Sequence, residues 1–258
     1  MARNDDKVQI RSIQKTIHVN RLNSRSGTFA TQTYNIKVPA RATVLDALLA
    51  IKETKDATLS MRYSCRMGIC GSCGMVINGR PSLACQTLLS SFENDITIGP
   101  MLGHPVLKDL VDDFDDFFEK HKSIMPWIMT SDKKKKFYPK ELTKQTKENV
   151  EKLIPFASCI KCGLCLDACP VVNTNPLFVG PQALAQTHKL IMDSRDEGPR
   201  KRLAIVDTKE GIWGCEFIGA CSTVCPKGVD PALAIQELKI ESMTEAIFGL
   251  RSKKNQKD

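Results

Sequence analysis

The sequence predicts an α+β protein of two domains: a small α+β domain followed by a mainly α-helical one. Three observations predict this arrangement. The chain has 258 residues, which is enough for two domains of ordinary size. Its cysteines fall into two blocks, residues 65–85 and 159–225, with a long cysteine-free stretch between them. Strand-like segments surround the first block and helix-like segments the second, so we place the domains at residues 1–110 and 111–258.

Four segments of the first domain predict strands. Residues 8–19 and 31–38 are rich in β-branched side chains with partial alternation of apolar and polar positions. The polar segment 23–27 between them predicts a hairpin turn. Residues 74–77 and 95–98 give further strand signals.

Residues 42–55 predict the single helix of this domain. Thr43 can cap its first turn, and Asp46 falls at the third helical position, where a carboxylate can accept from the amide of the capping residue. One side of the helix is apolar and carries Val44, Leu45, Leu48, Leu49 and Ile51.

The second domain contains four helix-like segments. Asp230 can accept from free backbone amides, and Pro231 gives up no donor that a first helical position needs, so a helix should begin there. We expect packing from its apolar residues Leu233, Ile235, Leu238 and Ile247. The predicted helices are residues 108–120, 140–153, 182–193 and 231–248.

Composition and charge exclude several classes of protein. No window approaches the roughly 20 apolar residues of a membrane-spanning helix, and residues 1–7 are polar without a signal region, so we expect a cytoplasmic chain. The net charge of +8 suits an anionic membrane surface or an acidic partner. Basic residues gather in the run 133–136 and in the C-terminal tail, with no RNA motif or zinc-finger spacing beside them. We therefore predict no nucleic-acid partner.

Eleven cysteines without an export signal favour metal binding over disulfides, because a reducing compartment does not preserve disulfides and an odd number cannot pair fully. Cys65, Cys70, Cys73 and Cys85 form C-x4-C-x2-C with a fourth cysteine eleven residues further on. This spacing is typical of a plant-type [2Fe-2S] site. The alternative is a structural zinc site, which usually has paired C-x2-C motifs.

The second block contains a repeated cysteine motif. Cys159, Cys162, Cys165 and Cys169 precede Pro170 in the C-x2-C-x2-C-x3-C-P spacing of bacterial ferredoxins. A second run has the same spacing with isoleucine in place of its second cysteine, and it consists of Cys215, Ile218, Cys221 and Cys225, followed by Pro226.

The fourth cysteine of each such run binds the other cluster. Cys159, Cys162 and Cys165 with Cys225 then form a complete [4Fe-4S] set. Cys215 and Cys221 with Cys169 form a set of three thiols beside apolar Ile218, which predicts a [3Fe-4S] cluster. Sets of four, four and three use all eleven cysteines. With no visible nucleophile, dinucleotide fingerprint or phosphate loop, the chain is predicted to conduct electrons, and the substrate chemistry belongs to a partner.

These motifs resemble the iron-sulfur subunit of succinate dehydrogenase and fumarate reductase. The resemblance rests on residues 64–74 (SCRMGICGSCG), 159–165 (CIKCGLC) and 225–228 (CPKG), and it extends to 104–110 (HPVLKDL) and 193–196 (DSRD). It implies a β-grasp [2Fe-2S] ferredoxin domain followed by a helical, bacterial-ferredoxin-like domain with two clusters. It also implies electron relay between FAD on a flavoprotein subunit and a quinone beside a membrane-anchor subunit, which in some relatives carries haem. The chain would then lie peripherally on the cytoplasmic face of the membrane.

The resemblance also indicates where the quinone would lie. In the family its pocket touches the segments around the three-iron centre, so Pro170, Ile218 and Trp213 are the candidate quinone-proximal residues. Thr174 and Glu216 stand where one version of that pocket has tryptophan and histidine, which favours a different quinone or anchor type.

Two alternatives remain open. One is a free-standing multi-cluster ferredoxin, against which the second domain and the basic charge count. The other is a subunit of a soluble fumarate reductase linked to thiols or disulfides. Such relatives usually add cysteine-rich sequence after the second run, and residues 227–258 contain no cysteine.

Overall fold

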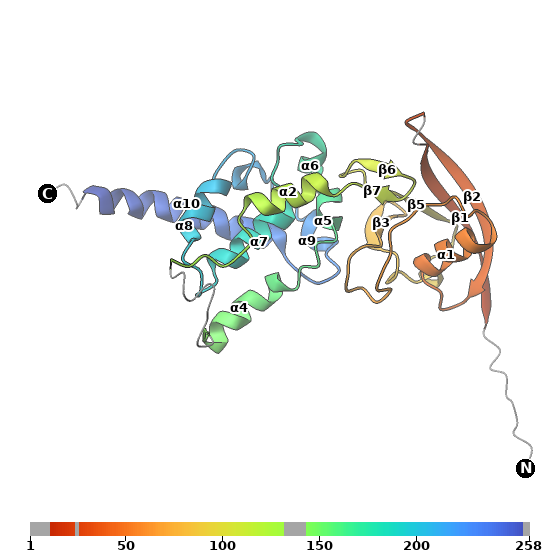
Figure 1. Cartoon of the computed structure of the whole chain (residues 1–258), viewed down its shortest axis with the longest axis horizontal. Coiled ribbons are helices and arrows are strands. Elements are labelled where there is room, and N and C mark those ends of the chain that lie inside the picture. The colour runs from red at the N-terminus through yellow and green to blue at the C-terminus, as the bar shows by residue number, and fades with distance from the viewer. Residues whose placement is uncertain (1–10, 24–25, 132–142, 255–258) are drawn as a thin grey trace, which may run out of the picture. The chain divides into compact units, whose positions relative to one another are not determined.

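The computed structural model describes residues 11–23, 26–131 and 143–254, with side chains described up to residue 247. The chain divides into two compact units (Figure 1). The first unit contains the residues up to 101 together with 106–112, and the second unit contains residues 102–105 and those from 113 onward. The predicted α+β fold class is confirmed.

The first unit is built on a five-stranded mixed sheet with the order β2-β1-β5-β3-β4. The β1–β2 hairpin is antiparallel, β1 pairs with β5 in parallel, and β3 pairs antiparallel with both β4 and β5. The hairpin prediction is therefore confirmed, although residues 8–10 lie outside the described part of the chain. The strands are β1 (Ser12–Asn23), β2 (Thr28–Pro39), β3 (Gly74–Ile77), β4 (Arg80–Leu83) and β5 (Ile96–Gly99).

Helix α1 (Val44–Thr54) has the predicted cap and contacts β2 (Figure 1). The Asp46 amide donates to Oγ1 of Thr43 at 3.2 Å, and the Thr43 amide donates to the Asp46 carboxylate at 2.9 Å. The predicted apolar side is buried. A short 3-10 helix, η1 (Leu89–Ser91), follows β4.

The predicted helix at residues 108–120 is wrong in its first half. The strands β6 (Val106–Lys108) and β7 (Val111–Asp112) form a small antiparallel pair there, and helix α2 (Asp115–Ser123) begins only afterwards. The physical reason is that Asp109 and Asp112 are buried acceptors. Asp112 accepts from the Met101 amide at 3.2 Å, and Asp109 has a φ of +50°, which a helix does not allow.

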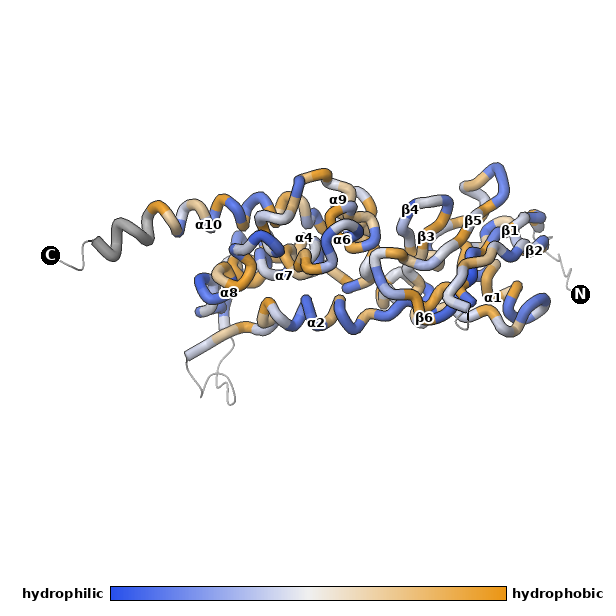
Figure 2. Tube along the Cα trace, turned by 90° about the horizontal axis from the view of Figure 1, so that it is seen from above, coloured by the Kyte–Doolittle hydropathy of each residue, from blue (hydrophilic) through white to orange (hydrophobic). Residues whose placement is uncertain are grey.

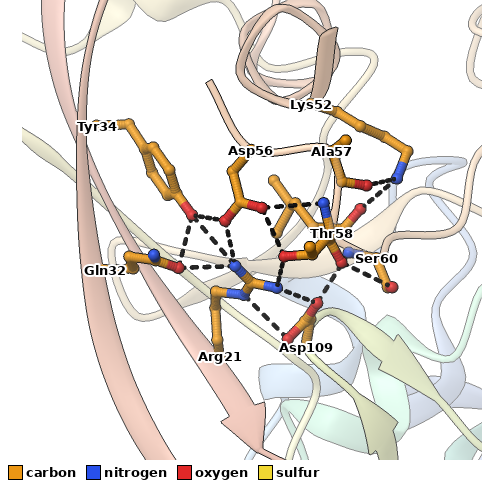
Figure 3. A network of polar contacts seen from close by, with 10 residues as sticks. Arg21, Gln32, Tyr34, Lys52, Asp56, Ala57, Thr58, Ser60 and Asp109 are labelled. Carbon is orange, nitrogen blue, oxygen red and sulfur yellow. Dashed lines mark hydrogen bonds and ion pairs between the residues drawn. The ribbon is translucent and has the colours of Figure 1, made fainter. Parts of the chain in front are cut away.

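Arg21 on β1 is the centre of a polar network in the first unit (Figure 3). Its Nε and Nη2 donate to the two carboxylate oxygens of Asp109 at 3.0 and 2.9 Å, and Nη1 donates to Asp56. Asp109 also accepts from the Ser60 amide at 2.9 Å. These bonds hold residues 56–60, the segment that leads into the first cysteine loop.

The second unit is helical, with α7 (Pro181–Ile191) and α10 (Pro231–Lys254) packed together. Their buried apolar residues, such as Leu184 and Leu238, belong to one hydrophobic core. Apolar and polar positions alternate along α10 (Figure 2). The other helices are α4 (Lys147–Ala157), α5 (Leu164–Asp167), α6 (Pro170–Thr174), α8 (Pro199–Val206), η2 (Ile212–Gly214) and α9 (Ala220–Thr223).

The helix predictions for this unit are largely confirmed. Helix α7 matches residues 182–193, and α10 begins as expected, because the Leu233 amide donates to Asp230 Oδ1 at 2.9 Å. Helix α4 starts at Lys147, later than residue 140, because Thr146 provides its cap. Residues 140–142 and the lysine run 133–136 lie outside the described residues.

The prediction that the apolar side chains of α10 pack is only half right. Ile235 and Leu238 are buried, whereas Leu233 and Ile247 are 47% and 59% exposed. Part of the apolar surface of α10 is not covered by other elements of the unit. The spacing of apolar residues in the sequence therefore overestimates how many of them are buried. Within the described ranges, no helix has the length and apolar character needed to cross a membrane.

Candidate metal centres

All eleven cysteines lie in the described part of the chain, and each is a free thiol. Nearly all of them are partly or fully buried, and Cys70 is the exception. None of the eleven is used in a disulfide, so each can lose its proton and bind a metal as a thiolate.

The first cysteine loop is curled by backbone with positive φ. Arg66, Gly68 and Gly71 have φ values of 57°, 70° and 77°. At Gly68 the positive φ favours glycine, and an added Cβ would lie 2.8 Å from the flexible side chain of Gln86, which would have to shift. The curl directs three amides to Sγ of Cys65, at 3.4, 3.3 and 3.3 Å, from Met67, Ile69 and Cys70.

Amide-to-sulfur hydrogen bonds link the four cysteines of the first unit two by two. The Cys65 amide donates to Sγ of Cys70 at 3.5 Å, and the Cys85 amide donates to Sγ of Cys73 at 3.5 Å. Gln86 adds a side-chain donor 3.7 Å from Sγ of Cys85. Amide donors of this kind stabilise negative charge on sulfur, and two pairs of thiols match the two irons of a [2Fe-2S] cluster.

Cys70 and Cys73 differ in acidity. A hydrogen bond with Ser72 lowers the pKa of Cys70 to about 6, because it stabilises the thiolate. Burial raises the pKa of Cys73 to about 12. Exposed Cys70 therefore favours the thiolate, whereas buried Cys73 needs a bound cation to hold a negative charge.

In the second unit the structure places Cys225 with the thiols of the first run. Burial raises the pKa of Cys162 to about 11, and neighbouring Cys159 and Cys225 act in the same direction. The pKa of Cys165 is also raised by burial and then by neighbouring Cys162, Cys159, Cys221 and Cys225. These thiols lie close enough to repel one another when ionised.

Cys169, Cys215 and Cys221 form the remaining group. Burial raises the pKa of Cys221 to about 11, and Cys169 and Cys215 raise it further. All three line one pocket, with about 350 Å³ of unfilled space including its open mouth. Ile218 lines the same pocket and is 57% exposed.

The two runs of the second unit repeat one backbone conformation. Lys161 and Phe217 have φ values of 54° and 57°, and Gly163 and Gly219 both have a φ of 80°. Short helices follow at corresponding positions, α5 in the first run and α9 in the second. Ile218 therefore occupies the position that Cys162 occupies in the first run.

The donor chemistry fits iron-sulfur clusters. Burial and neighbouring thiols raise the pKa values of Cys162, Cys165, Cys169 and Cys221, and a positively charged metal centre would offset this repulsion. Among the described residues, no group of His, Cys, Asp or Glu side chains is arranged to hold a single metal ion. The fit rests on the grouping of the thiols and on the amides directed at sulfur.

The structure separates the three candidate quinone-proximal residues. Pro170 and Ile218 line the pocket with the three thiols, whereas Trp213 is not among its lining residues. Nε1 of Trp213 donates to Oδ1 of Asp207 at 2.6 Å, and Nζ of Lys239 lies 5.8 Å from the centre of its ring.

The structure also describes Glu216 and Thr174, the two residues that the sequence analysis compared with one version of the family's quinone pocket. Glu216 lines the pocket. The Thr174 hydroxyl bonds to the carbonyls of Pro170 and Val171, both at 3.2 Å, and so closes the last turn of α6. Gln182 was not singled out from the sequence, and its side chain on α7 lies 4.0 Å from Sγ of Cys159.

Two domains with eleven free thiols, several of which lie close enough to raise one another's pKa, fit a multi-cluster iron-sulfur protein of the electron-transfer class. Residues 16–119 match the family described as 2Fe-2S iron-sulfur cluster binding domain, and residues 155–229 match the 4Fe-4S dicluster domain. The chain belongs to the family of fumarate reductase and succinate dehydrogenase iron-sulfur subunits.

Three comparisons support this membership. The fumarate reductase iron-sulfur subunit of Haemophilus influenzae is 42% identical over 226 residues, covering 84% of this chain and 88% of that protein. The succinate dehydrogenase iron-sulfur subunit of Paracoccus denitrificans is 39% identical over 197 residues, covering 76% and 74%. A chain of the Mycobacterium smegmatis Sdh1 complex matches with a TM-score of 0.78 and 29% identity, over 90% of this chain and 96% of that one.

Proposed function

We propose that this chain relays electrons between the FAD of a flavoprotein subunit and a quinone held at a membrane-anchor subunit, in a succinate dehydrogenase or a quinol:fumarate reductase. The observation that carries the proposal is the clustering of free thiols in both units, where Cys162 has Cys159 and Cys225 as neighbours and Cys221 has Cys169 and Cys215. Family membership supplies the reaction, because the relatives are named as subunits of these oxidoreductases.

Three clusters follow from the ligand sets. We assign Cys65, Cys70, Cys73 and Cys85 to a [2Fe-2S] cluster. The set Cys159, Cys162, Cys165 and Cys225 is assigned to a [4Fe-4S] cluster, and Cys169, Cys215 and Cys221 to a [3Fe-4S] cluster. The chain's part in the reaction is to hold these one-electron centres apart from water and to donate amide hydrogen bonds to their sulfurs.

The quinone end of the relay is proposed to lie beside the three-iron pocket. Pro170 and Ile218 line that pocket and present apolar surface. Glu216 brings a carboxylate to its lining, and Thr174 is engaged with its own helix backbone. This combination favours a quinone site that differs from the tryptophan–histidine version. Trp213 is the weakest of the three candidates, because it does not line the pocket.

The proposed location is the cytoplasmic face of the membrane, with the chain bound peripherally. The net charge of +8 suits an anionic surface or an acidic partner. An anchor subunit would supply the membrane-spanning part, with or without haem.

Anaerobic purification of the complex from its host tests the proposal. We expect a flavoprotein and an anchor subunit to copurify, with about nine iron atoms per copy of this chain. EPR should show three distinct iron-sulfur signals. Comparing fumarate reduction driven by benzyl viologen with quinone reduction driven by succinate then gives the direction. Zinc in place of iron, or a red-brown chain that purifies alone without detergent, would refute the proposal.

A further inference from the structure

A buried glutamine on α7 approaches one of the proposed cluster ligands. Gln182 is 2% exposed, and its Nε2 lies 4.0 Å from Sγ of Cys159 and 3.3 Å from Nδ1 of His121. An amide nitrogen carries two protons, so it can serve both acceptors at once. The carbonyl oxygen of the same side chain is buried and has no hydrogen-bond partner among the residues described.

That unpaired oxygen distinguishes Gln182 from a side chain placed only for stability. A buried polar atom without a partner costs free energy. One turn later on the same helix, buried Gln186 donates to the backbone carbonyl of Phe156 at 3.0 Å, which is an ordinary structural bond. Gln182 instead directs its amino group towards a sulfur and an imidazole.

His121 fixes this orientation of the amide. Burial lowers the pKa of His121 to about 4, and the positive charges of Lys161 and Lys189 act in the same direction. The ring is therefore neutral near pH 7, and its Nδ1 can accept a hydrogen bond. In the tautomer that carries its proton on Nε2, Nδ1 of His121 accepts from the amino group of Gln182 at 3.3 Å, and the same amino group lies 4.0 Å from Sγ of Cys159.

The charges around Cys159 favour extra negative charge on the sulfur. Burial and then the charge of Lys161 lower the pKa of Lys189, whereas Asp193 and the nearby Cys159 act in the opposite direction. A donor or a cation beside a cluster ligand stabilises the reduced cluster, which carries one more negative charge than the oxidised one. The Gln182 donor and the nearby lysine cations therefore each act to raise the reduction potential of a cluster bound by Cys159.

We infer that Gln182 sets the reduction potential of the four-iron cluster through an N–H···S hydrogen bond to Cys159, with His121 as the positioning residue that aims its amide. This inference rests on the proposed assignment of Cys159 to that cluster. It deepens the proposed function by naming the side chain that makes the four-iron centre easier to reduce.

Redox titration of the purified complex, monitored by EPR, tests the inference. In Gln182→Leu the midpoint potential of the four-iron cluster should fall, because the donor is lost while the volume is nearly kept. In His121→Leu, which leaves Gln182 present but not oriented, we expect a smaller fall. The potentials of the other two clusters in the same sample should stay at their wild-type values.

Gln186→Leu is the matched control, since it removes a buried amide of the same type, on the same helix, that donates to a carbonyl. Its four-iron potential should stay close to wild type. An unchanged potential in both the Gln182 and His121 variants, or an equal fall in Gln186→Leu, would overturn the inference. Absence of any four-iron signal from iron-loaded wild-type complex would instead refute the cluster assignment, so the two failures are distinguishable.

Discussion

Arg202 and Asp196 form an ion pair in which neither side chain is exposed to solvent. Nε of Arg202 also donates to the Met125 carbonyl at 3.1 Å. The carboxylate of Asp196 accepts from the amides of Met129 and Gly198 at 2.7 and 2.9 Å. The pair therefore joins the segment after α2 to the turn before α8, and each charge relies on the other for its solvation.

Asp196→Ala should destabilise the metal-loaded chain by about 3–5 kcal/mol, because it leaves a buried guanidinium without its counter-charge. Urea denaturation followed by circular dichroism measures the change. Arg200→Ala, in the helix that carries Arg202, is the control, since Arg200 pairs with Glu245 at 3.0 Å and the two side chains are 83% and 44% exposed. That exposed pair should contribute at most about 1 kcal/mol, and equal effects of the two substitutions would contradict the argument.

Ile218→Cys should convert the three-iron centre into a four-iron one. Ile218 has the backbone setting of Cys162 and lines the pocket of the three remaining thiols, so a thiol there can supply the missing fourth ligand. EPR of the oxidised complex should lose its three-iron signal, and the iron content should rise by about one atom per chain. Ile218→Val, which adds no ligand, should keep the signal. A three-iron signal that survives in the cysteine variant would refute the ligand assignment.

Local patterns allowed much of the fold to be predicted from the sequence. The Thr43–Asp46 cap and the Asp230–Pro231 start depend on neighbouring residues only, and both helices form as expected. The segment after residue 105 was misassigned because Asp109 is held by Arg21, 88 positions earlier in the chain. The periodicity of a segment depends on its own residues and cannot reveal a partner so far away in the chain.

The candidate site was predictable to a similar degree. Cysteine spacing predicted which thiols would lie together, and the structure places Cys225 near Cys162 and Cys169 near Cys215. The ligand sets themselves stay predictions. Gln182 could not be foreseen, because a lone glutamine has no spacing rule and its approach to Cys159 depends on how α7 packs.

Gly163 and Gly219 provide a test of the repeated loop. Both have a φ of 80°, but their surroundings differ. A Cβ at Gly163 would lie 2.8 Å from Nε2 of His104 and 2.8 Å from Cζ of Phe114, whose rings stack 4.4 Å apart, whereas a Cβ at Gly219 would meet no atom within 4 Å. Gly219→Ala should cost only the roughly 1–2 kcal/mol of left-handed backbone.

Gly163→Ala should cost that amount and roughly 1–3 kcal/mol more for the steric overlap. We also expect it to lower the EPR amplitude of the four-iron cluster, because Gly163 adjoins Cys162. Thermal denaturation of both variants gives the comparison. Adding His104→Ala to Gly163→Ala makes room for the methyl group and should recover part of the loss. Equal destabilisation by the two glycine substitutions would show that the stacked rings exert no constraint on the loop.

His121 should make the stability of the protein depend on pH in the mildly acidic range. Burial first, and then Lys161 and Lys189, lower its pKa from 6.5 to about 4. Between pH 4 and pH 6.5 the unfolded chain binds a proton at His121 that the folded chain does not bind. The free energy of unfolding therefore has its full value above pH 6.5 and decreases as the pH falls towards 4. From pH 7.5 to pH 5.5 the free energy of unfolding should drop by about 1 kcal/mol on account of this residue. His121→Gln has no titrating ring and should show a flatter profile in urea denaturation across that range. A profile that remains as steep as that of wild type would mean that His121 is protonated as readily in the folded protein as in the unfolded chain.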